Sequence, residues 1–251
     1  MKTKSGANLI LIVALALSVN AQQRETAYQN RGRYNEGTRT NPSNGPAGLD
    51  LIAALVDYDE LSKSLPANFH AQFFLPNNEP VYLTIREIKP EYWYWLDEVK
   101  PGSPWRPAAQ NSFEWPTATV IRSLNWGTAA LTLDRLGATV RVGRLNPGGV
   151  EQVLPVALFA SRAPAVVDGY RFVFWPAYQM RLKFQVFKAE NASPFDQAQE
   201  FKSVLAEQPL AVTWKAREWQ DGWYRLVVSG YTLSNNARVD KIIRFYHSRT
   251  M

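Results

Sequence analysis

The chain has 251 residues, 46% of them hydrophobic, so it can bury a sizeable core and form one or two domains. Lys and Arg number 28 and Asp and Glu number 22, which gives a net charge of +6. No basic strip gathers this charge, so the sequence does not predict nucleic-acid binding. The chain has no Cys, which excludes disulfides, thiolate metal sites and a lipid-modified cysteine.

The first 21 residues have the three parts of a secretory signal peptide. Lys2 and Lys4 form a basic start, an apolar run covers residues 9–17, and small residues lead to a cleavage site after Ala21. A membrane anchor is the alternative, but the run has roughly half of the about 20 apolar residues that a span needs. Since an exported protein without disulfides suits a bacterial envelope, we expect a periplasmic or extracellular bacterial chain with no transmembrane span after cleavage.

Two short regions precede the main body of the chain. Residues 22–48 are polar and nearly free of aliphatic side chains, so we interpret them as a flexible polar leader. Residues 49–65 carry apolar side chains at helical spacing, which predicts a short helix that ends at Pro66. The residues with this spacing are Leu51, Leu55, Tyr58 and Leu65.

From residue 66 onward, the hydrophobic period is two, which is typical of half-buried strands. Clear examples are 81–86, 138–143, 210–214 and 224–228. The Asn146-Pro147-Gly148-Gly149 stretch interrupts this pattern. We therefore predict an all-β protein of two immunoglobulin-like or fibronectin-like β-sandwich domains, at 66–146 and 150–251, with one or two short helices.

The second predicted domain contains a hairpin and a second helix. Tyr170, Phe172 and Phe174 repeat the period of two, and the same period returns from Met180 to Val186 after the turn at 175–177, which predicts a hairpin. Ser193-Pro194 has the form of a helix start, and apolar residues on one face follow it, so we expect a short helix over about 194–206.

The segment from Trp214 to Gly230 has Asp221-Gly222-Trp223-Tyr224-Arg225-Leu226-Val227-Val228-Ser229-Gly230 at its centre. It resembles the turn and strand found in many bacterial immunoglobulin-like and fibronectin-like modules. The resemblance implies a sandwich fold. Because such sandwiches carry unrelated functions, it transfers no catalytic residue.

The sequence offers no complete catalytic set. His70 and His247 are the two histidines, so a zinc site would lack ligands, and we expect no metal and no cofactor. No serine lies in a nucleophile elbow, and no phosphate-binding glycine loop is present. A carboxylate-dependent hydrolase remains an alternative, because two acids on facing walls of a cleft need no fixed spacing in sequence. The acids available for it are Glu87, Glu91, Asp97, Glu98 and Glu114.

Aromatic residues are dense between positions 92 and 126. On an extended strand, Trp93 and Trp95 face one side and Tyr92 and Tyr94 face the other, so one pair is buried and the other can stand exposed. These rings can fill a core or contact a partner, since Trp, Tyr and Arg dominate binding energies. The candidate binding residues are Trp93, Trp95, Trp105, Arg106, Trp115 and Trp223, the last because it is out of phase with Tyr224.

We predict a non-enzymatic binding or scaffolding protein of the bacterial cell envelope that acts through protein–protein contacts. These contacts would use the aromatic residues or open sheet edges. A carbohydrate-binding module that stacks exposed Trp rings on polysaccharide is a second hypothesis, and the carboxylate hydrolase is a third. The sequence does not define the oligomeric state.

Overall fold

The computed structural model describes residues 48–57, 67–88, 95–96, 105–106, 108–116, 136–142, 150–189, 191 and 193–250. These residues form strands, turns and irregular segments and no helix, so the predicted all-β class is confirmed for them. The predicted signal peptide and all of the predicted leader except Gly48 lie outside the described residues.

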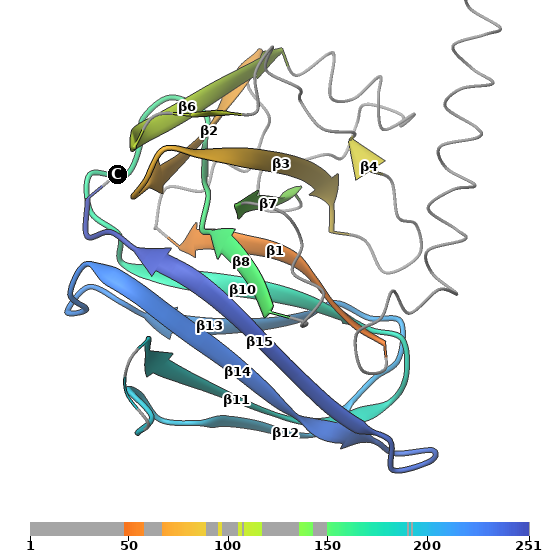
Figure 1. Cartoon of the computed structure of the whole chain (residues 1–251). Coiled ribbons are helices and arrows are strands. Elements are labelled where there is room, and N and C mark those ends of the chain that lie inside the picture. Colours follow the sequence, from red (N-terminus) through yellow and green to blue (C-terminus); the bar gives the residue numbers. More distant parts are fainter. Residues whose placement is uncertain are drawn as a thin grey trace, which may run out of the picture. The chain divides into compact units, whose positions relative to one another are not determined.

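Three sheets make up the described part of the chain (Figure 1). The inner sheet has the order β1 (Leu49–Asp57), β10 (Gly169–Pro176) and β13 (Leu210–Lys215). The long sheet has the order β12 (Gln199–Val204), β11 (Met180–Lys188), β14 (Gly222–Thr232), β15 (Arg238–His247), β8 (Val150–Leu154), β7 (Leu136–Val142), β3 (Glu79–Glu87) and β4 (Trp95–Leu96), with β5 (Trp105–Arg106) paired to β3. The cap sheet has the order β6 (Ala109–Pro116), β2 (Asn68–Leu75) and β9 (Ala157–Phe159).

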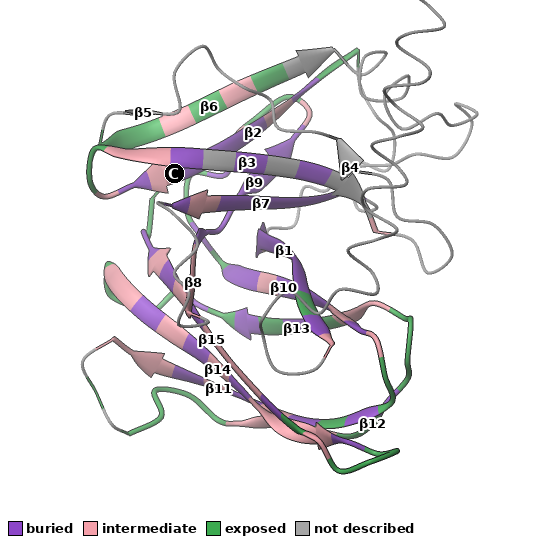
Figure 2. Cartoon of the chain, turned by 45° about the vertical axis from the view of Figure 1, so that its right-hand side comes forward, coloured by how far each residue is buried: buried purple, intermediate pink, exposed green. Residues whose placement is uncertain are grey.

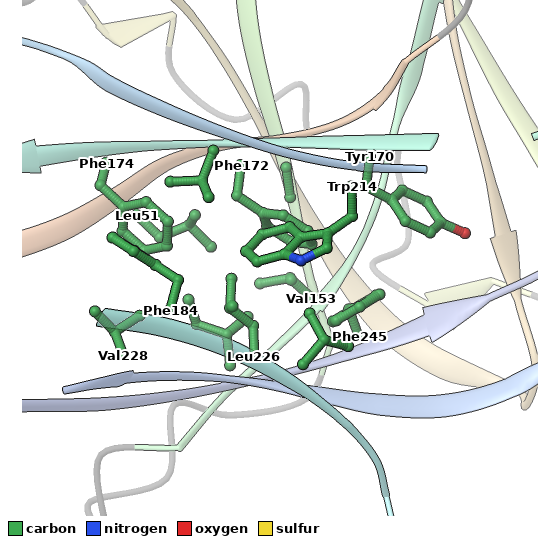
Figure 3. Close-up of a cluster of buried hydrophobic side chains, with 14 of the residues drawn as sticks. Leu51, Val153, Tyr170, Phe172, Phe174, Phe184, Trp214, Leu226, Val228 and Phe245 are labelled. Carbon is green, nitrogen blue, oxygen red and sulfur yellow. The ribbon is translucent and has the colours of Figure 1, made fainter. Parts of the chain in front are cut away.

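The first core lies between the inner sheet and strands β11, β14, β15 and β8 of the long sheet. Figure 3 shows Phe172 and Trp214 of the inner sheet pointing toward Leu226 and Phe245 of the long sheet. The ring of Phe172 meets Phe245 at 5.0 Å and Trp214 at 6.0 Å between centroids, edge-on in both cases. Each buried ring removes about 150–250 Å² from water, so this contact holds the two sheets together.

Strand β1 is buried on both faces. Leu51 belongs to the first core, and its neighbour Ile52 belongs to a second core on the other side of the inner sheet. The predicted helix over 49–65 is therefore wrong where the structure describes it. A strand that is covered on both faces is apolar at nearly every position, and such a run fits helical spacing as well as it fits a strand.

The second core is lined by the cap sheet, by strands β3 and β7, and by the side of the inner sheet that carries Ile52; Phe69, Phe73 and Leu83 are among its buried residues. The opposite face of β7 contacts β1, since Thr139 Oγ1 donates a hydrogen bond of 3.2 Å to the carbonyl oxygen of Ile52. Figures 1 and 2 accordingly show the inner sheet between β3 and β7 on one side and β11, β14 and β15 on the other.

Strands β10 and β11 follow each other in the chain but belong to different sheets. The predicted alternation is confirmed, because Phe172, Phe174, Leu182 and Phe184 are all buried. The predicted hairpin is wrong, because β10 pairs with β1 and β13 while β11 pairs with β12 and β14. The turn between them carries the chain across the core, so the rings of Phe174 and Phe184 meet at a tilt of 49°, 5.2 Å apart between ring centroids.

The predicted helix over 194–206 is also wrong. Residues 193–198 are irregular, and residues 199–204 form β12 at the edge of the long sheet. Pairing with β11 supplies backbone hydrogen bonds and places Phe201 edge-on against Phe184 at 5.6 Å. This tertiary contact outweighs the local helix-start signal at Ser193-Pro194.

The predicted division into two immunoglobulin-like domains, at 66–146 and 150–251, is not confirmed. Residues 44–251 form one compact unit. Strand β8 pairs with β7 on one side and with β15 on the other, so one sheet contributes to both cores. The structure thus shows two sandwich cores that share the long sheet.

Candidate functional site

The side of the long sheet that faces away from the first core carries a distinctive set of side chains over β11, β14 and β15. We call this surface the outer face. Along β14, buried residues alternate with half-buried ones, as Figure 2 shows by colour. Pairing between β14 and β15 sets the outward-facing residues of the two strands in cross-strand rows. In order along the strands, these rows are Trp223 with Tyr246, Arg225 with Arg244, Val227 with Ile242, Ser229 with Asp240, and Tyr231 with Arg238.

Aromatic rings support the arginines of the outer face. The guanidinium carbon of Arg225 lies 5.0 Å from the ring centroid of Phe187, and that of Arg244 lies 5.6 Å from the ring of Trp223. Tyr246 meets Trp223 edge-on at 5.4 Å. Cation–π contacts of this kind hold a flat, charged group in a defined place, so both arginines are fixed on the surface.

Arg225 and Arg244 lie directly opposite each other on neighbouring strands. Like charges in this arrangement repel and destabilise a sheet. Among the ion pairs that the described residues form, none includes either arginine. The register thus places two cations at directly opposed positions of the outer face, and neither forms an ion pair with a described residue.

At the other end of the outer face, two of the three cations form ion pairs, and Arg181 forms none with a described residue. Asp240 pairs with Arg238, and Lys183 pairs with Glu200 at 3.3 Å between Nζ and Oε1. Arg181 donates a hydrogen bond of 2.9 Å to the hydroxyl oxygen of Tyr231. A shallow, open hollow of about 570 Å³ lies here, lined by Ser229, Gly230, Tyr231, Asn236, Arg238 and Asp240.

Three polar groups inside the first core satisfy one another. His247 Nε2 lies 3.1 Å from the carbonyl oxygen of Trp219, and His247 Nδ1 lies 2.6 Å from the hydroxyl of Tyr170. Because a carbonyl oxygen only accepts, Nε2 carries the proton and Nδ1 accepts from the tyrosine. Burial lowers the pKa of His247, and burial raises the pKa of Tyr170 well above its ordinary value, so both groups are neutral. The histidine therefore stabilises the core and is not exposed to a ligand.

The structure describes five of the six predicted binding residues, and four of these only through their backbone. Trp93 lies outside the described residues. Trp95 lies on β4, Trp105 and Arg106 lie on β5, and Trp115 lies on β6. Strands β4 and β5 pair with β3, while β6 belongs to the cap sheet, so the structure places these residues on two sheets. Their part in binding stays a prediction.

Trp223 is the predicted residue whose side chain is described. It is half-buried, whereas Trp214 and Trp219 are each 5% exposed and Tyr224 is fully buried. This agrees with its expected position out of phase with Tyr224. Trp223 lies at the arginine end of the outer face, where it contacts Arg244 and Tyr246.

The residues considered for catalysis and metal binding do not form a site in the described part of the chain. Glu114 is exposed and accepts a hydrogen bond of 2.8 Å from Asn68 Nδ2. His70 stacks on Phe159 at 5.0 Å between centroids. Among the described residues, no three His, Asp or Glu side chains come together in a way that would hold a metal ion. The side chain of Glu87 is not described, and Glu91, Asp97 and Glu98 lie outside the described residues.

Sequence reasoning missed Arg225 and Arg244. These two residues are separated along the chain and meet only through the register of β14 and β15. A signal was present, since Trp223 and Arg225 alternate with the buried residues of β14, and Arg244 and Tyr246 do the same on β15. Taken together, the outward-facing residues of the two strands would have indicated one surface rich in arginine and aromatic residues.

Comparison with known proteins assigns no family. The chain matches no protein-family model and no curated protein. It is similar to dimeric latent PorU from Porphyromonas gingivalis, with 11% identity, 82% of this chain and 21% of that chain covered, and a TM-score of 0.26. It is also similar to a β-1,2-glucanase from Parabacteroides distasonis, with 11% identity, coverage of 78% and 30%, and a TM-score of 0.25. A β-glucuronidase from Parabacteroides merdae gives 9% identity, coverage of 82% and 29%, and a TM-score of 0.23.

The chain thus spans less than a third of each of these proteins. At these values, the likeness assigns neither a fold family nor a function. Within the described residues, the structure contains no apolar helix of membrane-spanning length.

Proposed function

We propose that this chain is an exported, non-enzymatic binding or scaffolding protein of the bacterial cell envelope, which acts through protein–protein contacts. Export is supported by the signal-like features of residues 1–21. We also propose that the part from residue 150 onward is an immunoglobulin-like module, which its resemblance around 221–230 supports.

The composition of the outer face carries the proposal of a protein partner. Protein interfaces are enriched in Trp, Tyr and Arg, and these types dominate the binding energy. The outer face combines Trp223, Tyr246, Arg225 and Arg244 with the half-exposed aliphatic row of Val227 and Ile242. Lys and Glu, which interfaces tend to avoid, occur on this face as the pair Lys183 and Glu200, on the edge-side strands β11 and β12.

The carbohydrate hypothesis gains no support from Trp223. A sugar ring stacks on an open aromatic face, but Arg244 lies over the ring of Trp223 and Tyr246 packs edge-on against it. The hypothesis therefore depends on the tryptophans whose side chains are not described.

Site-specific photocross-linking in the bacterium that encodes the chain tests the proposal. A benzophenone amino acid at Ile242 places the reactive group in the middle of the outer face, and the same group at the exposed Thr213 of β13 is the control. We expect a discrete cross-linked envelope protein from position 242 and not from position 213. A purified chain that is monomeric and cross-links to nothing from either position would contradict the proposal.

A further inference from the structure

We infer that the outer face recognises carboxylates of an acidic partner protein, and that Arg225 and Arg244 hold them. This inference rests on the proposed function and adds the chemistry of the partner. It starts from the register of β14 and β15, which sets the two arginines directly opposite each other, an arrangement of like charges that costs stability in the free chain. A pair of carboxylates between them would replace this repulsion with attraction.

The two guanidinium groups are prepared for such a ligand. One terminal nitrogen of Arg225 donates a 2.7 Å hydrogen bond to the carbonyl oxygen of Asn191, and the ring of Phe187 supports the group. The ring of Trp223 supports Arg244 in the same way. A guanidinium has five N–H donors, and its planar fork matches a carboxylate through two parallel hydrogen bonds. Because the rings restrict both arginines beforehand, less entropy is lost on binding.

The charges of the outer face indicate that the partner surface is negatively charged. Asp240 and Glu200 neutralise Arg238 and Lys183, which leaves Arg181, Arg225 and Arg244 as cations without an ion pair in the described part of the chain. Electrostatic complementarity between interfaces speeds association and rejects wrong partners. A partner surface with Asp and Glu side chains therefore fits this face.

A protein fits the outer face better than an anionic membrane does. Membrane-binding surfaces place exposed apolar side chains among the cations, where they can enter the bilayer. The large apolar side chains that stand exposed in the described chain are Val166, Tyr178, Phe195, Leu205 and Leu233, and none of them lies in the rows of the outer face. The apolar residues in those rows are half-buried, and Trp223 and Tyr246 pack against the second core, so none of them projects far enough to enter a bilayer.

Binding of poly-L-glutamate to the purified chain, measured by titration calorimetry at two salt concentrations, tests the inference. The test variant is Arg225→Gln/Arg244→Gln. The control is Arg162→Gln/Lys215→Gln, which removes the same two charges from exposed positions outside the long sheet. We expect at least a tenfold loss of affinity in the test variant and less than a twofold loss in the control. Equal losses in both variants, or no binding by the original chain, would overturn the inference.

Two further arms compare sources of negative charge. Polygalacturonate offers carboxylates on sugars, and vesicles of phosphatidylglycerol and phosphatidylcholine offer phosphates on a membrane. We expect weaker binding to both than to poly-L-glutamate at equal charge, and stronger binding to either would overturn the choice of a protein. If the glutamine variant does not fold by circular dichroism, Arg225→Lys/Arg244→Lys replaces it, with an expected loss of at least threefold because an ammonium group cannot pair through two hydrogen bonds. Unchanged affinity in the lysine variant would overturn the inference.

The inference and the proposed function can fail separately. If cross-linking from Ile242 captures the same envelope protein in the original chain and in the glutamine variant with equal yield, the proposed function stands and the role of the arginines is refuted. If cross-linking fails while the original chain still binds poly-L-glutamate more tightly than the glutamine variant does, the carboxylate site stands and the envelope partner is refuted.

Discussion

The hydroxyl of Tyr170 donates a hydrogen bond of 2.6 Å to Nδ1 of His247, and this bond joins the inner sheet to the long sheet inside the first core. Both residues are almost fully buried. The second ring nitrogen of His247 bonds to the backbone of Trp219, so the imidazole has a partner on each side. A buried polar group with complete hydrogen bonding fixes the positions of its neighbours, and losing one partner costs the full desolvation of the other.

We expect Tyr170→Phe to destabilise the fold by about 1–3 kcal/mol, because it leaves Nδ1 of His247 buried without a donor. The free energy of unfolding from urea denaturation measures this loss. Tyr178→Phe is the matched control, since Tyr178 is 53% exposed and its loss of a hydroxyl has little effect. Equal stability of the two variants would show that the buried bond contributes nothing.

The same histidine predicts a pH dependence of stability. Burial lowers the pKa of His247 in the folded chain, whereas in the unfolded chain the imidazole has a pKa of about 6.5. At a pH between these two pKa values, the unfolded chain binds more protons than the folded chain. The contribution of His247 to stability is therefore complete above its unfolded pKa and is lost as the pH falls through its folded pKa. We expect the urea midpoint to decrease more between about pH 7.5 and pH 5 in the original chain than in His247→Gln. Parallel decreases would assign the effect to other groups.

The strands that carry the first core were predictable from alternation, and their pairing was not. Phe172 and Leu182 lie where their period of two places them, on the inward faces of their strands. Alternation does not record which strand lies beside which, so the turn after β10 fits a hairpin and a crossing between facing sheets equally well. Strand β1 shows the second limit, because burial on both faces removes the alternation itself.

The arginine pair of the outer face shows a third limit of sequence reasoning. The alternation of inward-facing and outward-facing residues along each strand could have identified Arg225 and Arg244 as residues that point away from the core. Their placement opposite each other depends on the register between two strands, and register follows from how the whole core packs. Surface sites made of side chains from two strands are therefore harder to predict than the strands themselves.

Glu151 and Lys241 form an ion pair on the inward side of the long sheet, where β8 runs beside β15. Their oxygen and nitrogen lie 2.8 Å apart, and the side chains are 17% and 15% exposed. We expect Lys241→Met to cost about 2 kcal/mol, less than the loss of a fully buried pair, because it leaves a largely buried carboxylate unpaired. The double variant Glu151→Leu/Lys241→Met should recover most of this loss in urea denaturation. A double variant that is less stable than the single one would contradict this account.

Gly230 of β14 pairs with Leu182 of β11. A Cβ at this position would lie 2.0 Å from the backbone carbonyl oxygen of Arg181, a contact that only a shift of the backbone can relieve. We therefore expect Gly230→Ala to destabilise the fold by about 3 kcal/mol or more, because the added methyl group separates two paired strands of the long sheet. Ser229→Ala on the adjacent, half-exposed position is the control and should change the unfolding free energy by less than about 0.5 kcal/mol. Thermal and urea unfolding of both variants measure the difference, and a Gly230→Ala chain as stable as the control would show that β11 and β14 tolerate a wider separation.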